Sequence, residues 1–351
     1  MFYHRKIKLI VSTFLTVILT LGGILPVIGE IPSAYAAEIM VETKDSASSC
    51  PSINSSTDVN KVDSYLIKGM RVAHDSTEVF AREELEIWIN DLMKRVDDKF
   101  LNWYFNYFNQ KAMEFGVPFV WIMFKADFLN VLKSKDEKLL NANQIIEKRM
   151  INDFQNKFNE LVLKPEESQQ FLLKLTERSA LNYVSALGMN FARTKNCYNI
   201  SDQDWEKYLS SLGTLTYNTG NSQSSISASS LSSKLATNTV ILSTTVIGGK
   251  LALNFASKLA AKIAGKAAGA IMAQISAQIL DPVIGLGIFI FDVWSYDKMV
   301  KQSKPTLRQN ILEYFNEVKW SLLNGPQNSI MASIKDVESK MMAGLGSRSA
   351  Y

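Results

Sequence analysis

The segment from Asn238 to Tyr296 constrains the fold of this chain more than any other, because a large part of it is almost purely apolar. Between Ala267 and Phe291 the only charged residue is Asp281. A helix on the surface of a soluble protein carries one apolar stripe, whereas a helix that is apolar all round lies in a protein core or in a membrane. We therefore expect this segment to be buried in one of these two environments.

Asp281 and Pro282 divide the segment into two arms. Aspartate is a favoured cap of a helix N-terminus and proline is favoured in the first turn, so a new helix is expected to begin here. This predicts an apolar helical hairpin over residues 238–301. Its second arm has too few uninterrupted apolar residues to cross a bilayer, so a partly inserted hairpin is better supported than a full span. The candidate membrane contacts in this arm are Ile284, Leu286, Ile288, Phe289, Ile290, Phe291 and Trp294.

Four lysines of the first arm are further candidate membrane contacts. They are Lys250, Lys258, Lys262 and Lys266. The last three are spaced four residues apart, which places them on one face of a helix. Such a stripe can face anionic lipid headgroups while the apolar side enters the interface. It can equally be the solvent-exposed face of a helix packed in a soluble bundle. Gly265 and Gly269 add a spacing of small residues that lets a second helix approach closely.

The N-terminus has the pattern of an export signal. Residues 1–36 combine basic residues, an apolar stretch and Ala34-Tyr35-Ala36, which is typical of a signal-peptide cleavage site. An uncleaved anchor is the alternative, because the apolar stretch approaches bilayer length. In either case we expect the following chain to be exported, as a secreted, periplasmic or cell-envelope protein. Residues 37–77 are interpreted as a polar leader, and residues 210–237 as a Ser-rich linker.

Residues 78–209 carry the apolar repeat of long amphipathic helices. Apolar residues recur every three or four positions from Leu85 to Tyr107, which predicts one long helix with an inner face. Two more helices are expected to follow, separated by a break at Lys164 and Pro165. We find no convincing alternating pattern of the kind that predicts a strand.

The C-terminal part, residues 302–351, is expected to form two amphipathic helices. Pro305 would open the first, and Gly325 with Pro326 would end it. The predicted fold class is therefore all-α: a bundle of long amphipathic helices with an internal Ala/Gly-rich apolar helical hairpin.

No sequence pattern supports a catalytic, cofactor or metal site. The chain has two histidines, His4 and His74, and we expect His74 to be a surface residue. Three carboxylate pairs are interpreted as solvated helix faces or first-turn charges: Glu83-Glu84, Asp97-Asp98 and Glu166-Glu167. The sequence contains no Gly-rich phosphate loop, nucleophile elbow or zinc-binding helix motif. We therefore expect a non-enzymatic protein with no cofactor and no small-molecule substrate.

Charge and cysteine content add two expectations. The net charge of +4 includes the basic end of the signal and is too nearly balanced to indicate a nucleic-acid partner. Cys50 and Cys197 lack the short spacing of a zinc site. In an oxidising compartment they could pair and tie the mature N-terminus to the loop after the helical region. Two isolated thiols are the alternative.

A bundle of amphipathic helices that carries an apolar hairpin resembles, in architecture, the helical pore-forming toxins and the colicin-type channel domains. The resemblance covers residues 80–323 and rests on this arrangement rather than on a sequence motif. In those families a hidden hairpin inserts into a target membrane. The resemblance implies an exported protein that associates with or inserts into a membrane, with lipid as its partner and a homo-oligomeric pore as one form. The alternative is a soluble extracytoplasmic or envelope protein, structural or partner-binding, whose hairpin is buried core.

Overall fold

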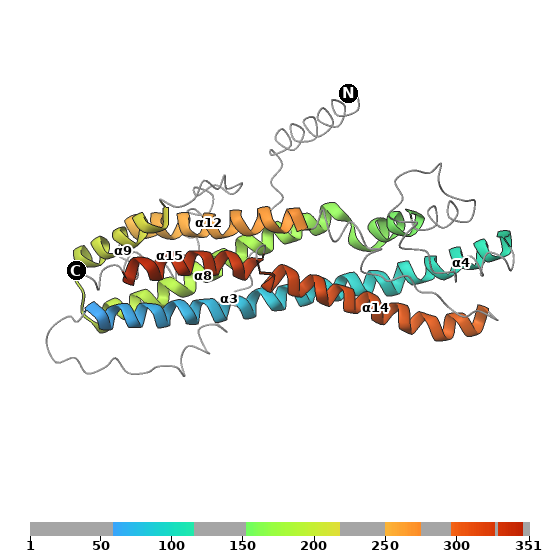
Figure 1. Ribbon diagram of the computed structural model, residues 1–351, viewed down its shortest axis with the longest axis horizontal. Helices are drawn as coiled ribbons and strands as arrows, with labels where there is room; N and C mark the ends of the chain where they lie inside the picture. Colours follow the sequence, from blue (N-terminus) through green and yellow to red (C-terminus); the bar gives the residue numbers. More distant parts are fainter. Residues whose placement is uncertain (1–58, 116–151, 218–249, 275–295, 327–328, 347–351) are drawn as a thin grey trace, which may run out of the picture. The chain divides into compact units, whose positions relative to one another are not determined.

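The computed structural model describes residues 59–115, 152–217, 250–274, 296–326 and 329–346 (Figure 1). Helices make up nearly all of these residues, and no strand occurs among them. All of them belong to one compact unit, Ile53–Tyr351. The predicted all-α class is confirmed for this part of the chain.

Helix α3, Val59–Arg95, is the longest helix that the structure describes, and it contacts α8, α14 and α15. It continues through π-helical turns at Val96–Phe100 into α4, Leu101–Phe115. The predicted inner face is buried: five of its seven members are at most 2% exposed, namely Leu85, Ile89, Leu92, Val96 and Phe100. The predicted end of the helix before Gly116 and Pro118 agrees with the observed end at Phe115.

The start of α3 differs from the sequence interpretation, which extended the polar leader to residue 77. The helix begins at Val59, and residues 59–77 belong to the bundle. The reason is an apolar stripe with helical spacing that continues upstream, formed by Val62, Leu66, Met70 and Ala73, all buried. The polar residues between them face outward and hide this stripe in a reading based on composition.

A break separates the next two helical stretches where the sequence predicted it. Residues 152–158 are helical and continue into π-helical turns at Asn159–Leu163. Lys164 then takes a left-handed backbone conformation with φ 43°, and α8 begins with proline at Pro165–Cys197. Gly69 of α3 is needed where α3 meets α8, since a Cβ there would lie 2.8 Å from Cβ of Asn190.

Helix α9, Asp202–Tyr217, was not predicted, and it occupies the first residues of the expected Ser-rich linker. Its apolar residues are few, but Trp205 is fully buried and Leu209 is 3% exposed. These two positions are one helical turn apart and dock the helix on the bundle, where α9 contacts α12 and α15.

The C-terminal part forms α12, Lys250–Gln274, α14, Tyr296–Asn324, and α15, Ile330–Gly346. The prediction that Pro305 opens a helix is wrong, because α14 begins at Tyr296 and passes through this proline on its exposed side. An interior proline removes one hydrogen bond and is tolerated where the surrounding helix is otherwise stabilised. The predicted end holds, since α14 stops before Gly325.

The α15 stripe is buried as predicted. Ile330, Ile334, Val337 and Met341 are all 0% exposed. Ser329 caps the helix, because its Oγ accepts a hydrogen bond from the backbone N–H of Ala332 at 3.1 Å.

Candidate functional site

Helix α12, the first arm of the predicted hairpin, is packed into the bundle. It contacts α8, α9 and α15. Over residues 256–269, whose side chains the structure describes, most buried side chains are alanines, and only Leu259 and Ile263 are large. The buried alanines are Ala256, Ala260, Ala261, Ala264, Ala267 and Ala268. This part of α12 is therefore core and packs mainly through small side chains.

The lysine stripe of α12 runs along its boundary with α15. Lys266 Nζ lies 2.9 Å from a carboxylate oxygen of Asp336, and Lys340 Nζ lies 2.8 Å from the same oxygen. Burial would raise the pKa of Asp336, but hydrogen bonds from Lys340 and Lys266 lower it overall. At Lys266 the lysine stripe therefore contacts α15. Lys258, which lies one helical turn before Lys262, is exposed.

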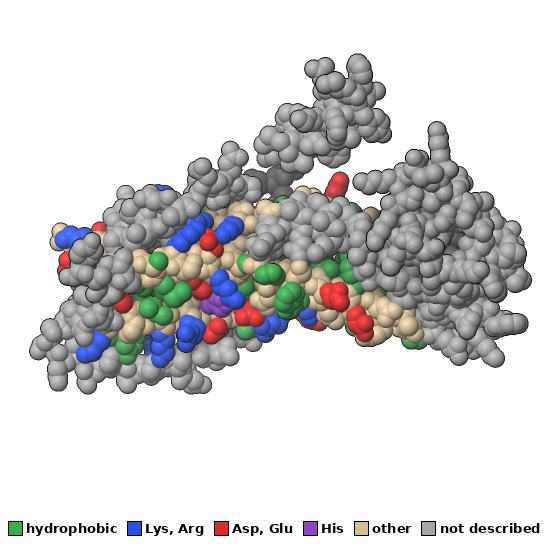
Figure 2. All heavy atoms as spheres, viewed as in Figure 1, with side chains coloured by type: hydrophobic (Ala, Val, Ile, Leu, Met, Phe, Trp, Pro, Cys, Tyr) green, Lys and Arg blue, Asp and Glu red, His purple; other side chains and the backbone are tan. Residues whose placement is uncertain are grey.

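Lys262 is partly buried beside this cluster. Burial lowers its pKa, and the positive charge of Lys340 lowers it further. Figure 2 shows basic side chains gathered beside an acidic one over the boundary between α12 and α15. Lys266 and Lys340 thus share one carboxylate oxygen of Asp336, and the ammonium group of Lys262 lies near both of these lysines.

The expected close approach at the small residues of α12 is not found at Gly269. This residue is exposed, and a Cβ added to it would have no neighbour within 4 Å. In the bundle, Gly269 therefore meets no second helix.

The remaining candidate membrane contacts lie outside the described residues. They are the side chain of Lys250 and the second-arm residues Ile284, Leu286, Ile288, Phe289, Ile290, Phe291 and Trp294. None of the helices that the structure describes combines the length and apolar character needed to cross a bilayer. The membrane role of the second arm stays a prediction.

His74 is not the surface residue that we expected. Its side chain is 16% exposed, and Nδ1 lies 3.0 Å from one carboxylate oxygen of Glu338 and 3.2 Å from the other. This contact joins α3 to α15. Beside it lies the buried phenol of Tyr183 from α8, whose pKa is raised by burial and then by the charge of Glu338. The positive charge of Lys335 lowers the pKa of His74, and the negative charge of Asp75 raises it.

The hydrogen bond to Glu338 raises the pKa of His74 above its ordinary value, against the opposing effect of burial. A raised folded-state pKa means that folding favours the protonated ring. The resulting stabilisation is complete below the unfolded-state pKa of about 6.5 and is lost as pH rises through the folded-state value.

We therefore expect the chain from Ala37 onward to lose stability between pH 6 and pH 8. In that chain His74 is the only histidine, because His4 lies in the predicted signal. His74→Gln keeps a hydrogen-bonding side chain without a titratable ring, and should flatten this part of the profile. Urea unfolding at half-unit pH steps measures it. An unchanged slope in the His74→Gln protein would contradict the assignment.

The three carboxylate pairs also take part in contacts between segments that the sequence did not predict. One member of each pair binds a basic residue of another segment. Glu84, only 9% exposed, binds Arg178 of α8 at 2.7 Å. Asp97 accepts hydrogen bonds from Arg308 of α14 at 2.8 Å and 3.0 Å. Glu84 thus contacts α8 and Asp97 contacts α14. Their neighbours Glu83 and Asp98 are exposed, as expected for solvated helix faces.

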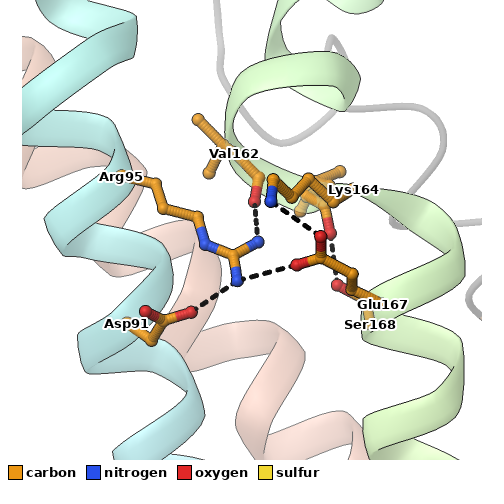
Figure 3. A network of polar contacts seen from close by, with 7 residues as sticks. Asp91, Arg95, Val162, Lys164, Glu167 and Ser168 are labelled. Atoms are coloured by element: carbon orange, nitrogen blue, oxygen red, sulfur yellow. Dashed lines mark hydrogen bonds and ion pairs between the residues drawn. The ribbon is translucent and has the colours of Figure 1, made fainter.

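The third pair contributes to a polar network at the C-terminal end of α3 (Figure 3). Arg95 binds Asp91 at 2.7 Å, Glu167 at 3.1 Å and the carbonyl oxygen of Val162 at 3.1 Å. Lys164 binds Glu167 at 2.7 Å. The network holds the left-handed turn before α8 against α3, so the break between the two helices is fixed in place.

The side chains that could bind a metal ion are dispersed over the described part of the chain. No group of three or more His, Cys, Asp or Glu side chains is placed there to hold a metal ion. Cys197, at the end of α8, packs against the core and its sulfur is in disulfide form. Its predicted partner Cys50 lies outside the described residues, so the bridge between these two cysteines stays a prediction.

Comparisons with known proteins give no relative from which a function could be transferred. No family model, no curated protein and no solved structure matches this chain.

Proposed function

We propose that this chain is an exported, non-enzymatic protein that associates with a membrane by releasing the apolar hairpin of residues 238–301 from its bundle. Membrane lipid is its partner, and a homo-oligomeric pore is one form that the inserted state can take. Two features support the proposal: the apolar sequence of the second arm, and the packing of the first arm in the described bundle.

The observation that carries the proposal is the small-residue packing of the middle of α12. Burial of apolar surface contributes about 0.8 kcal/mol per CH₂ group, so an alanine contributes far less than a leucine or phenylalanine. Over residues 256–269 the buried side chains of α12 are mainly alanine, whereas the buried side chains of α3 include leucine, tryptophan and phenylalanine. A helix held through small side chains can leave the bundle at lower cost, as a release-and-insert mechanism requires.

A second candidate function follows from the ion pair between Lys266 and Asp336. This contact ties α12 to α15, as in a helix that stays in the core permanently. In that case the chain is a soluble extracytoplasmic or envelope protein that binds a partner through its surface.

Vesicle flotation and dye release with the chain from Ala37 onward distinguish the two functions. Deleting the hairpin is unsuitable, since it removes a core helix. Instead, Ile288→Glu places a charge in the second arm, at a cost of about 2.5–3.5 kcal/mol if the site enters the bilayer centre. Dye release should fall on the order of 100-fold. Ile87→Glu makes the same change on α3, where the side chain is 59% exposed, and should leave release unchanged.

Failure of the unmodified chain to bind vesicles or release dye would rule out the membrane function and favour the soluble one. Equal dye release by the Ile288→Glu and Ile87→Glu proteins would show that the second arm does not insert.

A further inference from the structure

Helix α15 carries two acidic side chains that join it to two different helices. Asp336 contacts Lys266 of α12 at 2.9 Å, and Glu338 contacts Nδ1 of His74 on α3 at 3.0 Å. With 3.6 residues per turn, side chains two positions apart project from nearly opposite sides of a helix. Helix α15 is therefore tied to α12 on one side and to α3 on the other. We call the contact between His74 and Glu338 the α15 latch.

The groups around His74 come from three helices. Glu338 and the exposed Lys335 belong to α15, the fully buried phenol of Tyr183 belongs to α8, and Asp75 follows the ring on α3. The hydrogen bond to Glu338 is the main reason that the pKa of His74 is raised, and it acts against burial and the charge of Lys335. The ring therefore loses its proton at a pH above its ordinary pKa of 6.5.

The latch changes its charge near neutral pH, unlike the polar contacts further along α3. Those contacts with α8 and α14 are Arg178 on Glu84, Lys319 on Glu86 and Asn324 on Glu78. Carboxylate, ammonium and guanidinium groups ordinarily keep their charges between pH 6 and pH 8, whereas an imidazole loses its own. A change of pH in this range therefore acts on the α15 latch.

Loss of the proton weakens the latch. The ion pair becomes a contact between a neutral ring and a carboxylate whose side chain is only 12% exposed. A mostly buried charge that loses its opposite charge is costly. Stabilisation by the protonated ring is complete below about pH 6.5 and is lost as the pH rises through the folded-state pKa. The attachment of α15 to α3 therefore weakens above neutral pH.

A weaker attachment of α15 also affects the first arm of the hairpin. Helix α12 contacts α8, α9 and α15, and the ion pair between Lys266 and Asp336 lies at its boundary with α15. When α15 loosens, α12 loses support from one of these helices. Release of α12 then becomes easier.

We propose that the contact between His74 and Glu338 is a pH-dependent latch, which holds α15 against α3 at acidic pH and frees α15 and the α12 arm of the hairpin above neutral pH. This inference rests on the proposed membrane function and names its regulation. The opening of α15 can be measured without a membrane, so the latch and the membrane function are tested separately.

Hydrogen exchange of the α15 amides, residues 330–346, tests the latch in solution. It is measured at pH 6 and pH 8 in the chain from Ala37 onward and corrected for the intrinsic pH dependence of exchange. An ion pair is worth about five-fold in an equilibrium constant, so protection should fall by about this factor at pH 8. His74→Gln keeps the N-terminal amino group, which also titrates in this range, and should show equal protection at both pH values. An equal fall in both proteins would overturn the proposal.

Dye release from vesicles tests the effect on the hairpin. The unmodified chain should release dye about five-fold faster at pH 8 than at pH 6. Glu338→Gln removes the carboxylate that favours the protonated ring, so its release should be fast at both pH values. Glu83→Gln makes the same charge change at an exposed position of α3 and should keep the five-fold difference. Loss of the difference in both variants would show that net charge governs release, and would contradict the latch.

Phe158→Leu separates the latch from a general loss of stability. Phe158 is fully buried and packs on Phe315 of α14, at a junction away from His74. This protein should be less stable but should release dye at pH 6 as slowly as the unmodified chain. Release as fast as that of Glu338→Gln would mean that any loss of stability frees the hairpin, and the latch would be wrong.

Two combined outcomes separate the latch from the membrane function. If α15 loosens at pH 8 through His74 but vesicles are neither bound nor permeabilised at any pH, the latch stands and the membrane function is wrong. If Ile288→Glu abolishes dye release while His74→Gln keeps the pH dependence of the unmodified chain, the latch is wrong and insertion stands.

Discussion

Phe158→Ala is expected to lower the free energy of unfolding by about 3–5 kcal/mol, the largest stability effect among the changes considered. Phe158 is fully buried. Its ring meets Phe100 edge to face at a centroid distance of 5.0 Å and stacks on Phe315 of α14 at 6.0 Å. Truncation removes these contacts and leaves a cavity at the junction of three separate segments, because neighbouring side chains relax only partly. Equilibrium unfolding in urea measures the change.

Trp320→Ala is the matched control for this truncation. Trp320 lies on α14, the helix of Phe315, and its truncation removes a larger ring, but 60% of Trp320 is exposed. Its removal should change the free energy of unfolding by less than about 0.5 kcal/mol. Comparable losses in the two proteins would mean that the aromatic junction around Phe158 does not hold the bundle together.

The buried faces of the long helices could be predicted from sequence because they depend only on local spacing. Leu85 to Phe100, and Ile330 to Met341, repeat every three or four residues and are buried as expected. Leu101, Tyr104 and Phe105 form a second apolar face beside the first, and all three are at most 5% exposed. Helical period fixes which side of a helix turns inward.

The polar contacts between helices could not be predicted, because period does not say which helix lies opposite. His74 and Glu338 are 264 positions apart, and neither stands out in its own segment. Their contact depends on the packing of α15 against α3, a long-range feature. The contact between Lys266 and Asp336 likewise depends on long-range packing. The spacing of the lysine stripe allowed it to face lipid or water, but at Lys266 it meets α15.

The predicted helix boundaries were wrong where the polar composition of a segment was given more weight than the spacing of its apolar residues. Residues 59–77 are polar overall and were assigned to a leader, and residues 210–217, the end of α9, were assigned to a Ser-rich linker. A few large buried side chains, such as Leu66 and Trp205, were enough to dock them. Proline likewise marks a helix start only on average, and α14 continues across Pro305.

Ala264→Leu is expected to loosen α12 and to speed dye release. Ala264 is fully buried in the face of α12 that packs on the bundle. A leucine adds volume where the packing leaves none, which costs about 1–3 kcal/mol. If α12 must leave the bundle before the hairpin inserts, this cost applies to the packed state only, and the detached population rises about five-fold or more. Stopped-flow dye release and urea unfolding measure the two effects on one protein.

Gly269→Leu separates loosening from added apolarity. It places the same leucine side chain on the same helix, but at an exposed position with no neighbour within 4 Å of an added Cβ. Leucine favours a helix by somewhat under 1 kcal/mol relative to glycine, so this protein should be as stable as the unmodified chain or more stable. Faster release from Ala264→Leu alone would then follow from detachment of α12. Equally fast release by both proteins would mean that the added apolar side chain, and not detachment of α12, speeds release. If Ala264→Leu lowers stability without faster release, α12 stays in the bundle while the membrane is bound.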